Sequence, residues 1–428
     1  MNRSIPAILV IAAVLILVGF IILNDSEKES VVESHFPDLY IDTNGVGIND
    51  KENYVPCTIS IKDSDQELGD SSAGIKGRGN STWLDPKKPY NIKFDSKTDV
   101  LGMGKAKKWC LIANYCDLSL VRNYLAYDIA RNIGCDFTMD CRFVNLYINE
   151  EYRGLYLLTE KVEIGKTRVD IDDTIEQDVF DFLVEMDGNA PNEGIEGVDW
   201  FYVGDEEISI PFGMKDPDCT PEQMVYAKNI VQNAWNVIHN DPWKDVIECI
   251  DVDSFAASYI VEELFHEVDV NWSSFYMYCK DGKLYSGPIW DFDRSAGNRT
   301  FDYDPSITDP PYYYGPKSMD PTQLYAENGK WYVPLLRHHE FKEIISQKLS
   351  SLEEDFDTYL NTTYKDLISH QTDFEDNFRL WPMEDILPFY SNSYYETDWK
   401  SELEYVMDWL SKSLDNMKRT YSLQDSKL

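Results

Sequence analysis

The chain has 428 residues, of which 76 are acidic and 39 are lysine or arginine, so its formal net charge is −37 at pH 7. This charge opposes binding to nucleic acid or to an anionic membrane surface. It would attract a basic partner, but it is explained first by its contribution to solubility. Hydrophobic residues make up 43% of the chain and aromatic residues 14%, which excludes a disordered polymer and provides ample material for a core.

The N-terminal residues 1–24 contain a charge-free apolar run from Ile5 to Leu23, preceded by Arg3. About 20 apolar residues cross a bilayer as a helix, and a basic residue on the short side favours keeping that side in the cytoplasm. No clear cleavage site follows the run, which favours an uncleaved single-pass anchor over a removed signal peptide. We therefore expect a membrane-anchored protein whose bulk is extracytoplasmic, or a secreted one if the segment is cleaved.

Residues 25–36 are predicted as a polar tether, and a β-rich region follows from Pro37 to Phe94. Its alternating segments are broken by turn residues, which is typical of antiparallel strands. Within it, Gly77 and Gly79 would let the backbone approach a ligand closely, and Arg78 between them could hold phosphate through its guanidinium. A tight hairpin is the alternative explanation for the two glycines.

The middle of the chain predicts a helix, a hairpin and a strand. Helical periodicity runs from Leu118 to Ile133, with Gly134 as the stop. Segments 142–148 and 152–158, joined by Asn149-Glu150, predict a hairpin that runs into Glu160. Segment 182–186 predicts a further strand, and amphipathic patterns at 221–239 and 252–268 predict helices that begin a second, more helical lobe.

The segment around residues 274–293 is the strongest candidate for a metal site. Two apolar-aromatic runs joined by Lys280-Asp281-Gly282-Lys283 predict a hairpin, and Asp291-Phe292-Asp293 follows its second strand. In extended geometry the carboxylates of Asp291 and Asp293 share a face while Phe292 points into packing. Paired carboxylates suit Mg²⁺ or Mn²⁺ carrying phosphate. Asp269 and Asn271, which end the preceding helical pattern, would add an acid and an amide close to the same site.

Residues 294–330 are loop-like and rich in tyrosine and proline, and are either a wall of the substrate site or a surface insert. Residues 331–428 are predicted to be a helical C-terminal part, broken at Trp381-Pro382. Eight scattered cysteines without a Cys-x-x-Cys pair do not indicate a zinc ribbon or a thioredoxin-type site, and leave disulfides and buried free thiols equally open.

Several motifs in order make the chain resemble the spore-coat protein H (CotH) family of atypical kinases. The motifs are Lys76-Gly-Arg-Gly-Asn-Ser-Thr-Trp83, Tyr90-Asn-Ile-Lys-Phe94, Leu111-Ile-Ala-Asn114 with Arg122-Asn123, Asn149 with Tyr152-Arg-Gly-Leu-Tyr156 and Glu160, and Gly287-Pro-Ile-Trp-Asp-Phe-Asp293. The resemblance covers roughly residues 38 to 300 of the sequence. It implies an α+β fold, a diverged two-lobe protein-kinase-like domain at 37–330, with 331–428 as the helical C-terminal part of the same domain.

The resemblance also implies transfer of the ATP γ-phosphate to Ser or Thr of an extracytoplasmic or cell-surface protein, with Mg²⁺ or Mn²⁺. Its acceptor would be a basic, Ser/Thr-rich protein, and no nucleic acid is involved. In this interpretation Asp269 is the catalytic base, and Asp291, Asp293 and Asn271 hold the metal. ATP is held by the remaining candidates, which are Arg78, Asn80, Lys93 and Glu160.

The chain departs from ordinary kinases because it has no full Gly-x-Gly-x-x-Gly, no His-Arg-Asp and no Asp-Phe-Gly. Two other functions therefore stay open. One is a catalytically inactive surface adhesin or binding protein on the same fold. The other is metal-dependent glycosyl or nucleotidyl transfer, since Asp-x-Asp also serves nucleotide-sugar enzymes.

Overall fold

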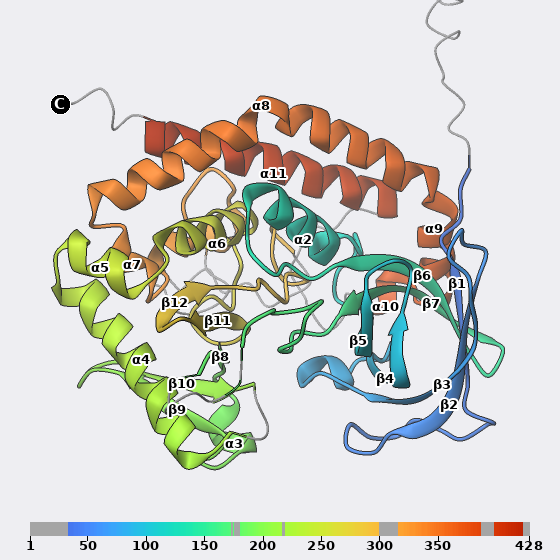
Figure 1. Cartoon of the computed structure of the whole chain (residues 1–428). Helices are drawn as coiled ribbons and strands as arrows, with labels where there is room; N and C mark the ends of the chain where they lie inside the picture. Colours follow the sequence, from blue (N-terminus) through green and yellow to red (C-terminus); the bar gives the residue numbers. More distant parts are fainter. Residues whose placement is uncertain are drawn as a thin grey trace, which may run out of the picture.

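The computed structural model describes residues 33–172, 174, 180–215, 219–298, 316–386 and 398–422 (Figure 1). The fold is mixed α+β, with a β-rich N-terminal part and a mainly helical C-terminal part, as the sequence predicts. None of the described helices is long and apolar enough to cross a membrane, and the predicted span at Ile5–Leu23 lies outside the described residues.

Seven strands of the N-terminal part form a closed barrel in the order β1-β2-β3-β4-β5-β7-β6. Their bounds are β1 (Asp38–Asp42), β2 (Val55–Lys62), β3 (Leu68–Gly77), β4 (Tyr90–Asp99), β5 (Lys105–Ile112), β6 (Cys141–Ile148) and β7 (Glu151–Glu160). Neighbours pair antiparallel except β1 and β6, which close the barrel in parallel. Alternate apolar residues such as Ile59, Ile75, Ile92 and Leu146 fill the interior, because successive side chains of a strand point to opposite faces.

A second, antiparallel sheet lies beside the barrel in the order β12-β11-β8-β10-β9 (Figure 1). Its strands are β8 (Phe182–Met186), β9 (Trp200–Gly204), β10 (Ser209–Met214), β11 (Phe275–Lys280) and β12 (Lys283–Ser286). The predicted strand at 182–186 and hairpin at 275–286 are confirmed. The register places Glu185 of the central strand β8 opposite Tyr276 of β11 and Gly213 of β10.

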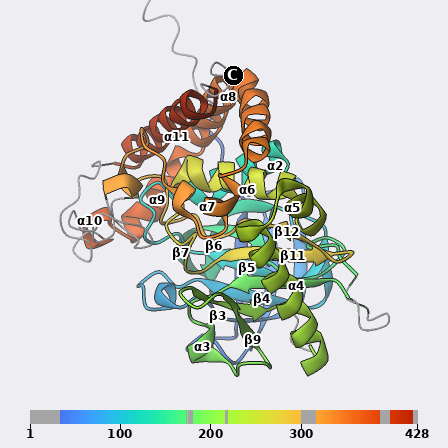
Figure 2. The ribbon, with the colours of Figure 1, turned by 90° about the vertical axis from the view of Figure 1, so that its left-hand side faces the viewer.

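The helices are α2 (Arg122–Ile133), α3 (Ala190–Glu193), α4 (Pro221–Asn240), α5 (Trp243–Cys249), α6 (Val252–Phe265), α7 (Tyr332–Leu335), α8 (His339–Ser369), α9 (Gln371–Leu380), α10 (Met383–Ile386) and α11 (Trp399–Ser422). Three 3₁₀ helices accompany them, η1 (Ser81–Trp83), η2 (Pro316–Met319) and η3 (Ala326–Asn328). In Figure 1 helices α8 and α11 run across the top of the molecule and α4 and α5 lie beside the second sheet, while the outer side of β1–β5 carries none of the described α-helices; Figure 2 shows the same arrangement turned by 90°. In both views α8 and α11 run side by side, and each packs on α6.

Helix α6 differs from its predicted form. We expected an amphipathic helix over 252–268, but every residue from Ser254 to Phe265 is buried, because α2, α8 and α11 and strand β12 all pack against it. The helix also ends earlier, since His266 adopts a left-handed conformation with φ 48° and caps it. The three-residue gap between α6 and Asp269 therefore belongs to the following loop.

A buried lysine joins the barrel to the C-terminal helices. The Lys87 ammonium donates hydrogen bonds to the carbonyls of Ala113 and Leu155, at 2.7 and 2.6 Å, and to Asn377 Oδ1 of α9 at 2.8 Å. Gly154 makes room for this contact, because a Cβ there would lie 2.6 Å from Asn377 Oδ1. Burial lowers the pKa of Lys87 well below its ordinary value, and three acceptors compensate the buried amine.

Three further sequence predictions can be compared with the structure. Residues 33–36, predicted as the end of the tether, pack on the C-terminal helices: Phe36 stacks on His370, and its N–H donates to Asp373 Oδ2 at 2.7 Å. The break at Trp381-Pro382 is confirmed, because α9 ends at Leu380 and α10 begins at Met383. All eight cysteines are free thiols, six of them buried.

Candidate active site

A cavity of about 680 Å³ lies between the open end of the barrel and the second sheet. We call it the interlobe cavity. It is lined by the 78–82 loop, by the ends of β4 and β5, by Glu185 and Tyr276 of the second sheet, and by residues of the loops at 269–274 and 290–294. A side pocket of about 260 Å³ shares six lining residues with it, which are Arg78, Gly79, Asn80, Asn91, Tyr276 and Trp290.

The cavity brings together three of the predicted acids, Asp269, Asp291 and Asp293. The segment that carries the last two is not a strand, since β12 ends at Ser286 and Asp291 has a left-handed φ of 73°. The predicted division of faces nevertheless holds. Phe292 is buried against Phe265, with ring centres 5.5 Å apart, and both flanking carboxylates line the cavity.

Buried polar residues hold this segment in place from behind. The Phe292 N–H donates to Asn123 Oδ1 at 2.7 Å, and Asn123 Nδ2 donates to Asn114 Oδ1 at 3.0 Å. Arg122, ion-paired with buried Asp117, donates to the carbonyl of Ser295 at 2.9 Å. Arg122 and Asn123, which do not line the cavity, therefore position the acids, whereas Asn114 supports Asn123 and also lines the cavity.

The three acids act on one another electrostatically. Burial, and next to it the charge of Asp291, raise the pKa of Asp269 to about 7 and that of Asp293 to about 8, while Arg294 opposes both shifts. Three close carboxylates in a partly desolvated cavity are hard oxygen donors that a divalent cation would stabilise. Among the described residues, no group of three or more His, Cys, Asp or Glu is placed to hold a metal ion. Because the donors present are hard carboxylate oxygens, they would suit Mg²⁺ or Mn²⁺ only together with further ligands from phosphate and water, which Mg²⁺ commonly keeps.

Asn271, the third predicted metal residue, makes its hydrogen bonds elsewhere. Its Oδ1 accepts a hydrogen bond from the Lys330 N–H at 2.7 Å, and its Nδ2 donates to the carbonyl of Asn328 at 3.4 Å. Ser274 takes the place at the acids instead, because its hydroxyl donates to Asp291 Oδ2 at 3.2 Å. In the kinase catalytic loop the metal-binding Asn comes five residues after the catalytic Asp, which is the spacing from Asp269 to Ser274. The five-residue spacing from Asp269 is therefore the signal in the sequence that could have pointed to Ser274.

The glycine-flanked loop at 77–80 contributes Arg78 to the cavity. Gly79 has φ 82°, and a Cβ there would lie 2.0 Å from Thr82 Oγ1, so the loop requires glycine at this position. The Arg78 guanidinium stacks on Trp290, with Cζ 5.5 Å from the ring centre, and makes no hydrogen bond to another described residue. Asn80 also lines the cavity, and its Oδ1 accepts from Lys51 Nζ at 3.4 Å.

Lys93 and Glu160, two of the predicted ATP contacts, line neither the cavity nor the side pocket. Lys93 is exposed on the outer face of β4, opposite Lys108 of β5, and the residue of β4 that reaches the cavity on the same face is Asn91, two positions earlier. Glu160 is buried at the end of β7 in an ion pair with Arg168, and burial raises its pKa to about 7.

An ion pair that the sequence did not predict lies in the cavity. Glu185 of β8 pairs with Lys215, whose Nζ lies 5.7 Å from the ring centre of Tyr276. The pairing of β8 with β10 brings Lys215 to this place, and no local pattern predicts it. Arg294 closes the opposite side, where it donates to Ser81 Oγ at 3.0 Å.

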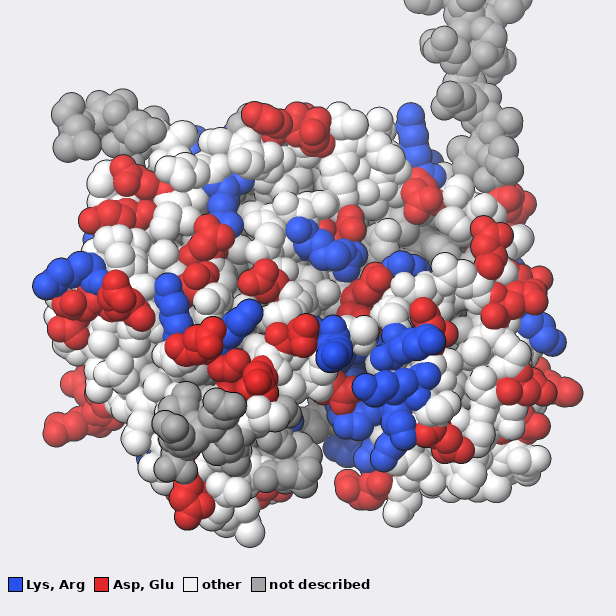
Figure 3. Space-filling view, in the orientation of Figure 1, with Lys and Arg blue, Asp and Glu red and all other residues white. Residues whose placement is uncertain are grey.

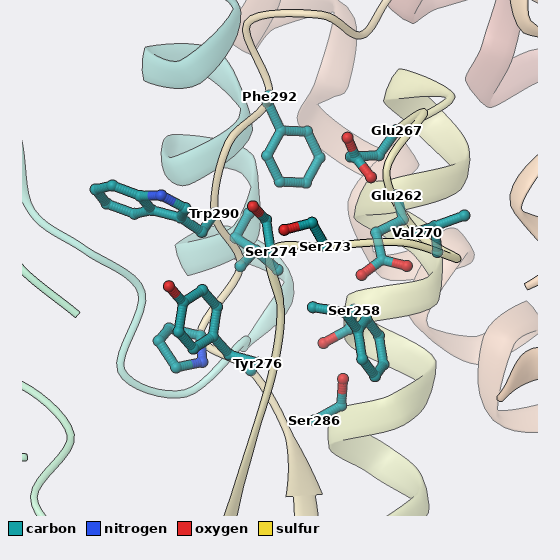
Figure 4. Close-up of a pocket in the computed structure, with 14 residues that line it drawn as sticks. Ser258, Glu262, Glu267, Val270, Ser273, Ser274, Tyr276, Ser286, Trp290 and Phe292 are labelled. Atoms are coloured by element: carbon teal, nitrogen blue, oxygen red, sulfur yellow. The ribbon is translucent and has the colours of Figure 1, made fainter. Parts of the chain in front are cut away.

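A small enclosed pocket lies behind the loop that carries the acids (Figure 4). Its volume of about 10 Å³ has room for one water molecule. The wall between it and the interlobe cavity consists of residues that line both, which are Ser273, Ser274, Tyr276 and Trp290. Figure 4 shows the carboxyl groups of Glu262 and Glu267 beside it. One oxygen of each, Glu262 Oε2 and Glu267 Oε1, makes no protein hydrogen bond, and burial raises the pKa of both groups.

The surface outside the side pocket is basic. In Figure 3 lysine and arginine side chains gather over the β3–β4–β5 face of the barrel, on a molecule otherwise rich in acids. Lys76 of β3 and Lys93 of β4 both lie over the Tyr54 ring, and Lys93 faces Lys108 directly across the β4–β5 pair. Like charges directly opposite in a sheet are destabilising, and here the ion pair of Lys108 with Glu163, at 2.9 Å, offsets the repulsion.

A comparison with protein-family models finds one match, to the family described as CotH kinase protein, over residues 75–417. This range contains the 77–80 loop, the three acids of the cavity, and most of the helical C-terminal part. No curated protein matches the chain.

Proposed function

Because the chain belongs to the CotH kinase family, we propose that it is an atypical protein kinase that transfers the γ-phosphate of ATP to Ser or Thr of an extracytoplasmic or surface protein. The observation that carries the proposal is the meeting of Asp269, Asp291, Asp293 and Arg78 in one cavity below a glycine-flanked loop. Phosphoryl transfer needs these parts, namely acids for a metal, a cation for phosphate and a group that accepts the hydroxyl proton.

We place the base of the nucleotide in the side pocket and its phosphates in the interlobe cavity. The pocket is mainly polar, and Cys110, Val162, Tyr276 and Trp290 form the apolar part of its wall, against which the base would pack. Arg78, at the junction of the two hollows, has donors available for phosphate oxygens in a bidentate arrangement.

Asp291 and Asp293 would hold Mg²⁺ or Mn²⁺, and the bound ion would neutralise part of the negative charge of the ATP phosphates. Asp269 lies on the other side of the acid cluster, after α6, and is assigned to the acceptor hydroxyl. Asp269 takes the proton of the acceptor hydroxyl while the hydroxyl oxygen bonds to the γ-phosphorus of ATP. The bond between the γ-phosphorus and the β–γ bridging oxygen breaks in the same step, and ADP leaves with that oxygen. A base whose pKa lies near neutral pH is suited to this step.

The test is a thermal-shift and filter-binding screen of ATP, GTP and UDP-sugars, each with and without Mg²⁺ or Mn²⁺, followed by transfer of labelled phosphate to a basic Ser/Thr-rich protein. We expect metal-dependent binding of ATP that Arg78→Gln weakens by about tenfold, the order expected for charged hydrogen bonds to one group. Arg142→Gln is the matched control, because Arg142 is paired with Asp140 on the barrel surface away from both hollows. Binding of a UDP-sugar instead would favour glycosyl or nucleotidyl transfer, and binding of no nucleotide would favour the adhesin.

A further inference from the structure

The interlobe cavity has an uneven distribution of charge. Arg78 lies at the end that opens to the side pocket, where Lys51 and Lys161 also line the wall. The opposite wall is formed by the segment after β8, and it carries Asp187 and Glu193. The one lysine of that wall, Lys215, is ion-paired with Glu185, so the wall as a whole keeps a negative charge.

Trp272 stands on the acidic wall and has 47% of its surface exposed. It follows Asp269 by three residues, and its N–H donates to the Asp269 carbonyl at 2.7 Å. Its own carbonyl accepts the Gly188 N–H at 2.8 Å. The indole lies directly against Gly188, because a Cβ at that position would be 2.3 Å from the ring. The two backbone hydrogen bonds hold the main chain of Trp272 next to the proposed catalytic base, and the indole packs on Gly188.

A large exposed indole next to carboxylates is a recognition element for a cationic side chain. The face of tryptophan attracts a cation more strongly than that of tyrosine or phenylalanine, and adjacent acids add a charge partner. A neutral or acidic side chain would gain neither interaction. The position close to Asp269 restricts the occupant to a residue near the hydroxyl that accepts the phosphate.

We propose that Trp272, with Asp187 and Glu193, forms a subsite for a lysine or arginine side chain adjacent to the phosphorylated residue of the acceptor. The proposal rests on the proposed kinase function and deepens it, because it makes Trp272 a determinant of acceptor specificity. Gly188 is a positioning residue in this subsite, since it lets the indole lie over the wall.

The experiment uses the full chain and three acceptor peptides that differ only in the residues flanking one serine, which are arginine, glutamine or glutamate. The wild type should prefer the arginine peptide in kcat/KM. Trp272→Leu should lower the arginine-to-glutamine preference by roughly 3- to 30-fold, and Trp272→Phe by less, because phenylalanine retains part of the interaction. Asp187→Asn with Glu193→Gln should lower the same ratio, and the KM for ATP should not rise in this variant, because loss of negative charge from the cavity does not weaken phosphate binding.

Trp243→Leu is the matched control, since Trp243 is a partly buried tryptophan of α5 that lines neither hollow. A wild type without preference for arginine, or a Trp272→Leu variant that lowers transfer to all three peptides equally, would overturn the subsite. The same peptides with alanine for serine are measured by fluorescence anisotropy. Trp272-dependent binding of the arginine form without any phosphate transfer would keep the subsite and reject the kinase.

Discussion

Replacing Asp293 by asparagine in the metal-free protein tests the electrostatics of the acid cluster. Asp293 is only 5% exposed, and burial followed by the charge of Asp291 raises its pKa from 3.8 to about 8. The unfolded chain therefore loses this proton near pH 4, whereas the folded chain keeps it until about pH 8. Between these values the folded state binds more protons, so the free energy of unfolding falls as pH rises and levels off above pH 8.

The size of the effect follows from the pKa shift. One pKa unit corresponds to about 1.4 kcal/mol, which gives an upper bound of about 6 kcal/mol for this carboxyl over the whole window. Since Asp291 and Asp269 share the repulsion, we expect about 3 kcal/mol between pH 5 and 8.5. The amide of the variant cannot ionise, so Asp293→Asn should become more stable relative to the wild type by about this amount as pH rises.

The assay is urea unfolding followed by the fluorescence of the 11 tryptophans at several pH values, in chelator and then with Mg²⁺ and ATP. Glu262→Gln is the control, because Glu262 is a buried acid whose pKa is also raised to about 8 but which lies outside the interlobe cavity. Both variants should gain stability at high pH, and only Asp293→Asn should lose the stabilisation by Mg²⁺ and ATP. A gap between Asp293→Asn and wild type that does not widen with pH would refute the reasoning.

Three other outcomes are expected. Asp269→Asn should leave the affinity for Mg²⁺–ATP within a few-fold, while phosphate transfer falls by roughly 100-fold or more. Asp291→Ala should weaken the binding of Mg²⁺–ATP itself. Equal losses of melting temperature and of binding in both variants would contradict the assigned roles. Replacing Lys76, Lys93 and Lys108 together by Gln should slow the association of ATP by roughly tenfold at low salt, and by much less above 0.5 M NaCl. Stopped-flow measurements that show a slower association rate and an unchanged dissociation rate would support electrostatic steering of ATP by these lysines. Protease shaving of intact cells should remove the region after residue 33, and a protected domain would reject the extracytoplasmic orientation.

The elements that local pattern determines were predictable from the sequence. The 275–286 hairpin has a turn signal between two aromatic runs, and α2 ends at Gly134, whose φ of 85° is the conformation that made it a stop signal. The approach of Asp269 to Asp291 and Asp293 was also predicted, because the hairpin brings the two loops together. Asp269 is separated from Asp291 and Asp293 only by one β-hairpin, so their approach depends on local structure.

Contacts that depend on distant strand pairing were not predictable. The parallel β1–β6 closure joins residues more than a hundred positions apart, and the Lys215–Glu185 ion pair requires the register of β8 and β10. Lys93 was assigned to ATP by the family resemblance, because alternation alone left open whether it points to solvent or into the cavity. It is exposed, and on its face of β4 the residue that reaches the cavity is Asn91. Asn271 was chosen by residue type, where spacing from Asp269 would have indicated Ser274.

The Lys87 junction has a consequence for the way the chain can be divided. The barrel supplies the ammonium and two of its acceptors, and α9 supplies the third through Asn377. A barrel truncated before α9 would expose Phe143, which packs on Phe374 of α9, and would leave a desolvated amine one acceptor short. The N-terminal and C-terminal parts are thus one cooperative folding unit that recombination could not exchange as separate modules, and calorimetry of the intact body should record a single transition.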